Sequence, residues 1–143
     1  MPRDRRRLLA GLLAVAAIGL SGCVSTQADT AAGTDEPAKV EPVPGTSLHK
    51  LVLTQEAVGR VGIKTDTVTA KGIPLAAVVY DKDGATWTYT NPDPATYVRA
   101  AVTLGAVDGD IAALHQGPAA GTAVVTVGAA ELLGTEFGVG TGG

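Results

Sequence analysis

The sequence predicts a mainly β fold, a small single-domain β-barrel or β-roll with one short helix. Short segments rich in Val, Ile and Thr are separated by turn signals made of Gly, Pro, Asp and Asn, a spacing typical of strands joined by tight turns. Glycine is abundant, at 19 residues, whereas aromatic residues make up only 3% of the chain, so the core is expected to be thin.

Strands are predicted where β-branched or apolar residues run or alternate, over 48–53, 63–69, 73–80, 85–90, 97–104, 111–114 and 122–127. A short helix is expected over 55–60, because Thr54 offers an N-cap and Gly62 a stop. One helical turn is expected over Gly128–Leu133.

Turn residues join these strands. Asp81-Lys82-Asp83-Gly84 predicts a β-hairpin, since Gly84 can take a positive φ. Asn91–Pro94 and Asp108–Asp110 predict two further turns. Alternation along 97–104 predicts that the side chains of one set face the core, namely Val98, Ala100, Val102 and Leu104.

The first residues have the pattern of an export signal. Met1–Arg7 is basic, and Leu8–Leu20 is an apolar run of 13 residues, shorter than the roughly 20 that a membrane span needs. Leu20-Ser21-Gly22-Cys23 resembles the bacterial lipobox, which implies cleavage between Gly22 and Cys23 and transfer of diacylglycerol to the Cys23 sulfur. An ordinary signal peptide with a chance cysteine is the alternative.

Arg5 and Arg6 also match a weak twin-arginine motif, so export through either the general or the twin-arginine pathway stays open. The predicted organisation is a signal peptide over 1–22, a lipid-anchored flexible tether over 23–47, a β-domain over 48–137 and a flexible Gly-rich tail over 138–143. The predicted location is the extracytoplasmic face of the cell membrane.

Charge argues against a nucleic-acid partner. Without residues 1–22 the chain keeps 143 − 22 = 121 residues, with 7 Lys and Arg against 13 Asp and Glu, a net charge of 7 − 13 = −6. Binding to phosphates needs a basic surface, which this composition does not supply.

The candidate reactive residues favour a non-catalytic protein that needs no cofactor or metal. The β-domain has no Cys, Ser47 lies at its edge, and His49 and His115 are its only histidines. Asp81-Lys82-Asp83-Gly84 also resembles the start of a calcium loop, but the later ligands are missing. The G-x-G-x-x-G spacing of the C-terminal glycines has no helix to follow it.

Trp87 and Tyr89 are two residues apart and therefore share one face of a strand. Two interpretations are open. Both rings can pack in the core or across strands with Tyr80 and Tyr97, or they can form an exposed contact for a partner protein.

Three segments resemble the membrane-proximal domain of periplasmic adaptors, the membrane-fusion proteins of resistance-nodulation-division (RND) efflux pumps. They are LTQEAVGRVGIKTDTV (53–68), IPLAAVVYDKDGATWTY (73–89) and TYVRAAVTLGAVDGDIAALHQGPAAGTAVVTVGAAELLGTEF (96–137). The shared pattern is a Pro-initiated strand, a D-x-D-G hairpin, a V-x-x-G strand end and a closing G-x-x-V-V-x-x-G. Nearly the whole β-domain is covered.

The chain also departs from that family. Adaptors insert a lipoyl-like domain, an α-helical hairpin and a β-barrel between the two ends of this domain, whereas Thr69-Ala70-Lys71-Gly72 joins them directly here. The resemblance therefore implies a reduced adaptor in which the early segment 48–69 pairs with the late segment 122–127. It also implies an accessory role in efflux or transport, with a permease or other transporter subunit as partner. The alternative is a small ligand-binding or sensory lipoprotein with no pump.

Overall fold

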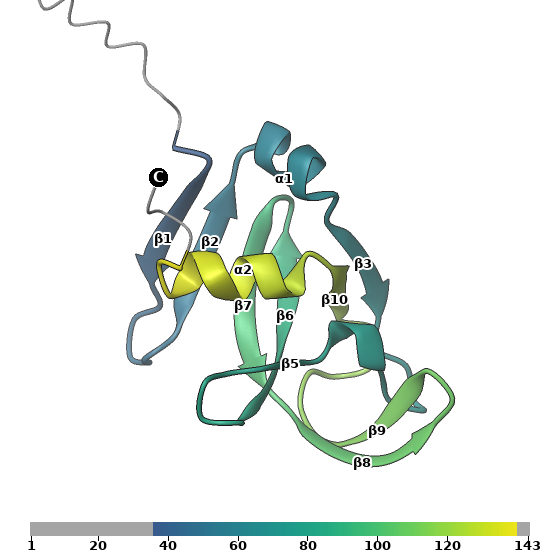
Figure 1. The fold of residues 1–143 in the computed structure, drawn as a ribbon. Coiled ribbons are helices and arrows are strands. Elements are labelled where there is room, and N and C mark those ends of the chain that lie inside the picture. The colour runs from purple at the N-terminus through teal and green to yellow at the C-terminus, as the bar shows by residue number, and fades with distance from the viewer. Residues whose placement is uncertain (1–35, 140–143) are drawn as a thin grey trace, which may run out of the picture. The chain divides into compact units, whose positions relative to one another are not determined.

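The computed structural model describes residues 36–139, which form a mainly β domain (Figure 1). The predicted signal peptide, Cys23, residues 24–35 of the predicted tether and residues 140–143 lie outside this range. A mainly β, small single domain is therefore confirmed. The sheets do not close into a barrel, so of the two predicted forms, β-barrel or β-roll, the barrel is excluded.

The larger sheet is antiparallel, with the order β1-β2-β7-β6-β10-β3, and β5 pairs with β6 outside this path. Its strands are β1 (Ala38–Pro42), β2 (His49–Leu53), β3 (Lys64–Thr67), β5 (Val79–Tyr80), β6 (Thr86–Asp93), β7 (Thr96–Ala101) and β10 (Ala123–Val127).

The smaller sheet has the order β4-β9-β8. Its strands are β4 (Ile73–Pro74), β8 (Thr103–Asp108) and β9 (Ile111–Gln116). Val102, between β7 and β8, is buried where the chain passes from one sheet to the other. The single strand predicted over 97–104 is thus two strands, one in each sheet.

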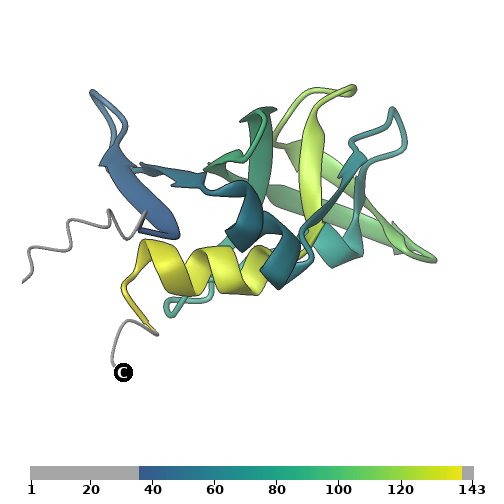
Figure 2. The same ribbon diagram turned by 90° about the horizontal axis from the view of Figure 1, so that it is seen from above.

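Both α-helices lie on the same face of the larger sheet (Figure 2). Helix α1 (Gln55–Val61) begins where the Thr54 side chain accepts a hydrogen bond from the Ala57 amide, and it ends at Gly62, which has a φ of 71°. The prediction for this helix is confirmed. Helix α2 (Ala129–Glu136) crosses the sheet and is longer than the single turn that was predicted.

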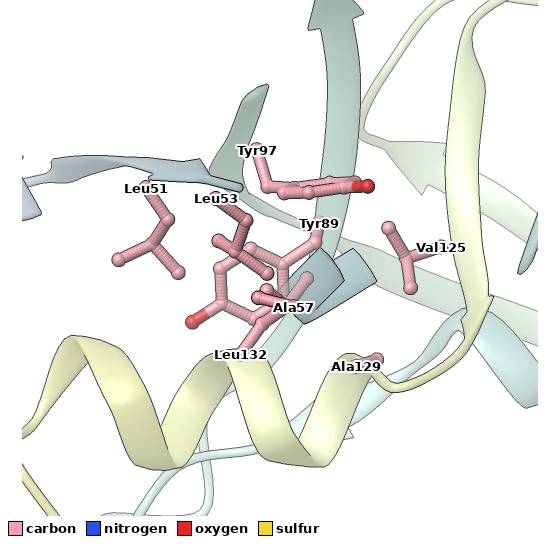
Figure 3. Close-up of a cluster of buried hydrophobic side chains, with 8 residues drawn as sticks. All are labelled: Leu51, Leu53, Ala57, Tyr89, Tyr97, Val125, Ala129 and Leu132. Carbon is pink, nitrogen blue, oxygen red and sulfur yellow. The ribbon is translucent and has the colours of Figure 1, made fainter. Parts of the chain in front are cut away.

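The main core lies between the larger sheet and the two helices (Figure 3). Its buried members are Leu51, Leu53, Ala57, Tyr89, Tyr97, Val125, Ala129 and Leu132. A second cluster lies between the two sheets and contains Val68, Ile73, Ala77, Val102, Ala112 and Val124. Burial of a Leu or Val side chain stabilises the fold by roughly 1.5–3 kcal/mol. The two clusters are small and separate, so the core is thin.

Four predictions about local structure are wrong. Strand β1 lies inside the predicted tether, because prolines exclude a helix but not an edge strand. The 73–80 segment is broken by a 3₁₀ turn, η1 (Leu75–Ala77). On β7 the buried side chains are Tyr97 and Arg99, not Val98 and Ala100, whereas Val102 and Leu104 of the predicted set do pack in or against the second cluster. Gly138 and Val139 are bonded to the end of α2 by their amides instead of starting a flexible tail.

The early and late segments do pair. Strand β3 is antiparallel to β10, with Thr65 opposite Val125 and Asp66 opposite Val124. The Val68 amide donates to the Thr122 carbonyl at 2.9 Å. This pairing confirms the predicted contact between 48–69 and 122–127, although the sheet that contains it stays open.

The turn that joins β3 to β4 depends on Gly72. Thr69 and Gly72 exchange backbone hydrogen bonds, Gly72 has a φ of +139°, and a Cβ there would lie 1.9 Å from the Ala112 carbonyl oxygen. Any side chain at residue 72 would therefore push the turn away from β9.

We predict that Gly72→Ala lowers the free energy of unfolding by about 2–6 kcal/mol, from backbone strain plus overpacking. Gly109→Ala is the matched control, since Gly109 also has a positive φ, +60°, but open space around it; it should cost about 1–2 kcal/mol. Urea denaturation followed by Trp87 fluorescence measures both. Equal losses would show that the close approach to Ala112 is unimportant.

Candidate functional site

The strongest candidate is a buried cluster of polar side chains, Tyr89, Arg99 and Glu136. The side chains of Arg99 and Glu136 are only 7% and 0% exposed, although Arg and Glu are almost never fully buried without a partner. Tyr89 on β6 lies directly opposite Arg99 on β7, and Glu136 comes from the last turn of α2.

The Glu136 carboxylate is the centre of this cluster. The Tyr89 hydroxyl donates a hydrogen bond to Glu136 Oε2 at 2.5 Å, and Arg99 Nη2 lies 3.2 Å from Glu136 Oε1. His49 Nδ1, on β2, lies 3.6 Å from the same Oε1, and the His49 side chain is 43% exposed. One carboxylate therefore joins α2 to three neighbouring strands.

Helix periodicity places this carboxylate. Leu132 and Glu136 are four residues apart and share the helix face that packs on the sheet. Leu132 is buried in the main core (Figure 3). Glu136 follows it one turn later and forms the ion pair with Arg99. The contact between α2 and the sheet is thus apolar at Leu132 and polar one turn later, at Glu136.

Two aromatic rings flank the guanidinium of Arg99. Its Cζ lies 4.1 Å from the centroid of the Trp87 ring and 5.0 Å from that of Phe137, so both contacts are cation–π interactions. The Trp87 indole N–H in turn donates to Asp81 Oδ2 at 2.9 Å. The network therefore extends from α2 to the hairpin between β5 and β6.

The environment shifts two of these groups in opposite directions. Burial, with the Glu136 hydrogen bond and charge as smaller causes, raises the pKa of Tyr89 far above its usual value, so the phenol stays protonated in the folded domain. The hydrogen bond from Trp87 lowers the pKa of Asp81, and the Ala85 and Asp83 amides add to this effect.

The two residues predicted as a possible partner contact, Trp87 and Tyr89, differ in their exposure. Tyr89 is fully buried, so the prediction that it contacts a partner is wrong, and core packing is what the structure shows. Trp87 is partly buried under Arg99 and pairs with Val79 and Ala101 across the strands. Tyr97 is buried in the same core, whereas Tyr80 is 63% exposed.

The D-x-D-G sequence forms a hairpin turn. Asp81 Oδ1 accepts hydrogen bonds from the amides of Asp83 and Ala85, and Gly84 has a φ of 81°. Both Asp81 oxygens are thus occupied by N–H donors. Within residues 36–139, no group of three or more His, Cys, Asp or Glu side chains could hold a metal ion.

No family model, curated protein or solved structure matches this chain. The resemblance to adaptors therefore rests on the three segments quoted above.

Three hollows on the surface are open, and the buried cluster lines none of the three. One, of about 380 Å³, lies between the start of β1, helix α1 and the end of α2. Another, of about 590 Å³, lies beside the outer side of α2, between Phe137 and the Asp81-Lys82 turn. A third, of about 290 Å³, lies between the Thr69–Gly72 turn and β9. Neither α-helix among residues 36–139 is long and apolar enough to cross a bilayer.

The cluster links α2 to the larger sheet inside the domain. The Tyr89 phenol and the Arg99 guanidinium both face Glu136, which leaves only the half-exposed His49 edge in contact with solvent. Sequence reasoning missed Arg99 and Glu136. The available signal was the i, i+4 spacing of Glu136 from Leu132, which places a carboxylate on the apolar face of α2.

We predict that Glu136→Ala destabilises the domain by about 3–5 kcal/mol, because it leaves Arg99 buried without a counter-ion. Arg99→Ala should cost a similar amount for the same reason. The double variant should lose clearly less than the sum of the two, and urea denaturation of all four proteins gives the coupling energy. Additive losses would mean that the two side chains do not stabilise each other.

Proposed function

We propose that this protein is a lipid-anchored, non-catalytic domain on the extracytoplasmic face of the cell membrane that serves as an accessory or adaptor-like component of a transporter. Cys23 would carry the lipid after removal of residues 1–22. Two acyl chains or more give stable anchoring, because each buried methylene contributes about 0.8 kcal/mol.

The observation that carries the transporter role is the pairing of β3 with β10. In adaptors the membrane-proximal domain is assembled from both ends of the chain. Here the residues that resemble those two ends form adjacent strands, with Thr65 opposite Val125. The tight Thr69–Gly72 turn stands where an adaptor has its inserted domains. A domain without those insertions lacks the tunnel-building parts, so an accessory role fits better than a full adaptor role.

The contacts of the candidate reactive residues support a non-catalytic role. Glu136 and Tyr89 bond to each other inside the domain. The ring of His115 lies against Gly105 on the neighbouring strand β8, where a Cβ would come within 2.7 Å of Nε2. The Tyr89 hydroxyl does meet a carboxylate base, but both side chains are fully buried, out of reach of a substrate.

An apolar surface at the end of α2 supports binding to another protein. Phe137 and Val139 are 53% and 73% exposed. They line the same hollow as Ala130 and Leu133, next to the Asp81-Lys82 turn. Exposed apolar side chains gathered around a hollow are typical of a protein-contact surface. We infer that this surface, and not the buried Tyr89, faces the transporter.

The test is photo-crosslinking in intact cells of the native host. Benzoylphenylalanine in place of Phe137 keeps an aromatic ring beside Arg99 and should capture an integral-membrane transport subunit. The control carries the probe in place of Val107, which is 56% exposed but lies on β8 of the smaller sheet, and should capture much less. Capture of no transport subunit from residue 137 would contradict the transporter role.

The anchor is tested in the same cells. Cys23→Ala should leave the domain in the soluble fraction or as an uncleaved precursor, and any domain released to the soluble fraction should lose capture at residue 137. A Cys23→Ala protein that matures normally and keeps its lipid would show that the anchor lies elsewhere.

A further inference from the structure

The outer edge of β1 carries unpaired backbone groups. Strand β1 is the first in the order of the larger sheet, and no other described strand pairs with its outer side (Figure 1). The amide of Val43 donates to the Leu48 carbonyl, and the amide of Thr54 donates to the Pro37 carbonyl. Because antiparallel strands alternate between inward and outward groups, residues 37, 39, 41 and 43 bond to β2.

The outward groups are therefore those of the alternate residues. Ala38 and Val40 each present an N–H and a carbonyl to solvent, whereas Pro42 presents only a carbonyl, since proline has no N–H. Such a row of groups is a template for another strand.

The opposite edge of the same sheet is different. Strand β3 forms that edge, and the Thr67 amide is already bonded to the Asp66 side chain, Oδ1, at 2.7 Å. Because the Val68 amide bonds inward to Thr122 and the backbone groups alternate in direction along the strand, those of Thr67 and Thr65 point outward from β3. Only Thr65 keeps a free outward amide there, so β3 is a poor template.

We propose that β1 is a dimerisation edge that pairs antiparallel with β1 of a second copy, centred on Val40. In this register Val40 of each copy exchanges both of its outward hydrogen bonds with Val40 of the other. Each Ala38 N–H meets the Pro42 carbonyl of the other copy. Every available donor on β1 then has an acceptor.

The charges of β1 select this register. With Val40 opposite itself, Lys39 of each copy stands directly opposite Glu41 of the other, on one face of the joined sheet. Glu41 already pairs with Lys50 of its own β2 at 2.8 Å, and this contact lowers the Glu41 pKa. The Glu41 carboxylate is therefore ionised and placed on the face where the second Lys39 arrives.

Apolar contact is available on the other face. Val40 stands opposite Leu51, hence on the helix side of the sheet, and is 42% exposed. In the dimer the two Val40 side chains lie side by side there, next to the hollow lined by Ala38, Leu53 and Val139. The second copy thus covers an apolar edge that is open in the single domain.

The geometry also explains why pairing stops at two copies. An isologous contact uses the same edge of both molecules and leaves no second β1 edge. The remaining edges of the joined sheet are the two β3 strands, each with Thr67 bonded to Asp66, and the two β5 strands, each only two residues long. A closed dimer, not a growing fibre, follows.

The test is oxidative crosslinking of the full-length protein in its membrane through Val40→Cys. The two Cα atoms would be about 5.5 Å apart in this register, within disulfide range. A crosslinked dimer is expected from Val40→Cys, but not from Val107→Cys or from the parent chain, whose only cysteine is Cys23. No dimer from Val40→Cys, or equal dimer from Val107→Cys, overturns the proposal.

Charge reversal tests the register. In the Val40→Cys background, Lys39→Glu or Glu41→Lys alone turns both cross-strand attractions into repulsions and should lower the crosslinked fraction about tenfold. Lys64→Glu, the same change on β3, is the matched control and should have no effect. Differently tagged Lys39→Glu and Glu41→Lys chains, expressed together, should crosslink to each other, which also shows that both fold.

Failure of that mixed pair to crosslink, or an equal loss with Lys64→Glu, would overturn pairing about Val40. The dimer does not depend on the transporter role. If residue 40 does not crosslink while residue 137 still captures a transport subunit, the dimer is contradicted and the transporter role is not.

Discussion

The ion pair between Arg99 and Glu136 is the interaction on which the rest of this domain depends. The core is thin, with few large side chains. Helix α2 buries only Ala129 and Leu132 in it, and Leu133 packs against it in part. Glu136 adds a hydrogen bond from β6 and an ion pair with β7 at the far end of the helix. Removing one member of a buried pair is costly because the other remains charged out of water, so α2 and the sheet are held as a unit.

The ion pair between Arg99 and Glu136 also determines where the neighbouring surface side chains lie. Because Arg99 is drawn toward Glu136, Trp87 and Phe137 lie against its guanidinium, and Trp87 in turn bonds to Asp81 in the hairpin turn. Helix α2 also contacts β1 and β2, which keeps β1 in the sheet although only β2 pairs with it. The proposed transporter surface at Phe137 and the proposed dimer edge at β1 are therefore both placed by the same helix.

Local signals predicted local structure well. The N-cap at Thr54, the stop at Gly62 and the Asp81–Gly84 hairpin depend on residues close in sequence, and the structure has all three. The buried face of β7 could not be predicted that way, since Arg99 is buried only because Glu136 neutralises it from a helix far along the chain. Strand β1 was missed because its prolines resemble those of a tether, and the open sheets because closure depends on where Val102 turns the chain between them.

Native-state hydrogen exchange tests the central claim most directly, because it reports the opening of α2 without any substitution. Two amides are to be compared. One is that of Leu132 in α2, which donates to the Gly128 carbonyl, and the other is that of Val102, just after β7, which donates to the Thr86 carbonyl of β6. If the Glu136 contacts hold α2 to the sheet, both amides exchange only through global unfolding, with the same free energy and the same dependence on denaturant. Exchange of Leu132 through a local opening, at a free energy well below that of Val102, would contradict this account.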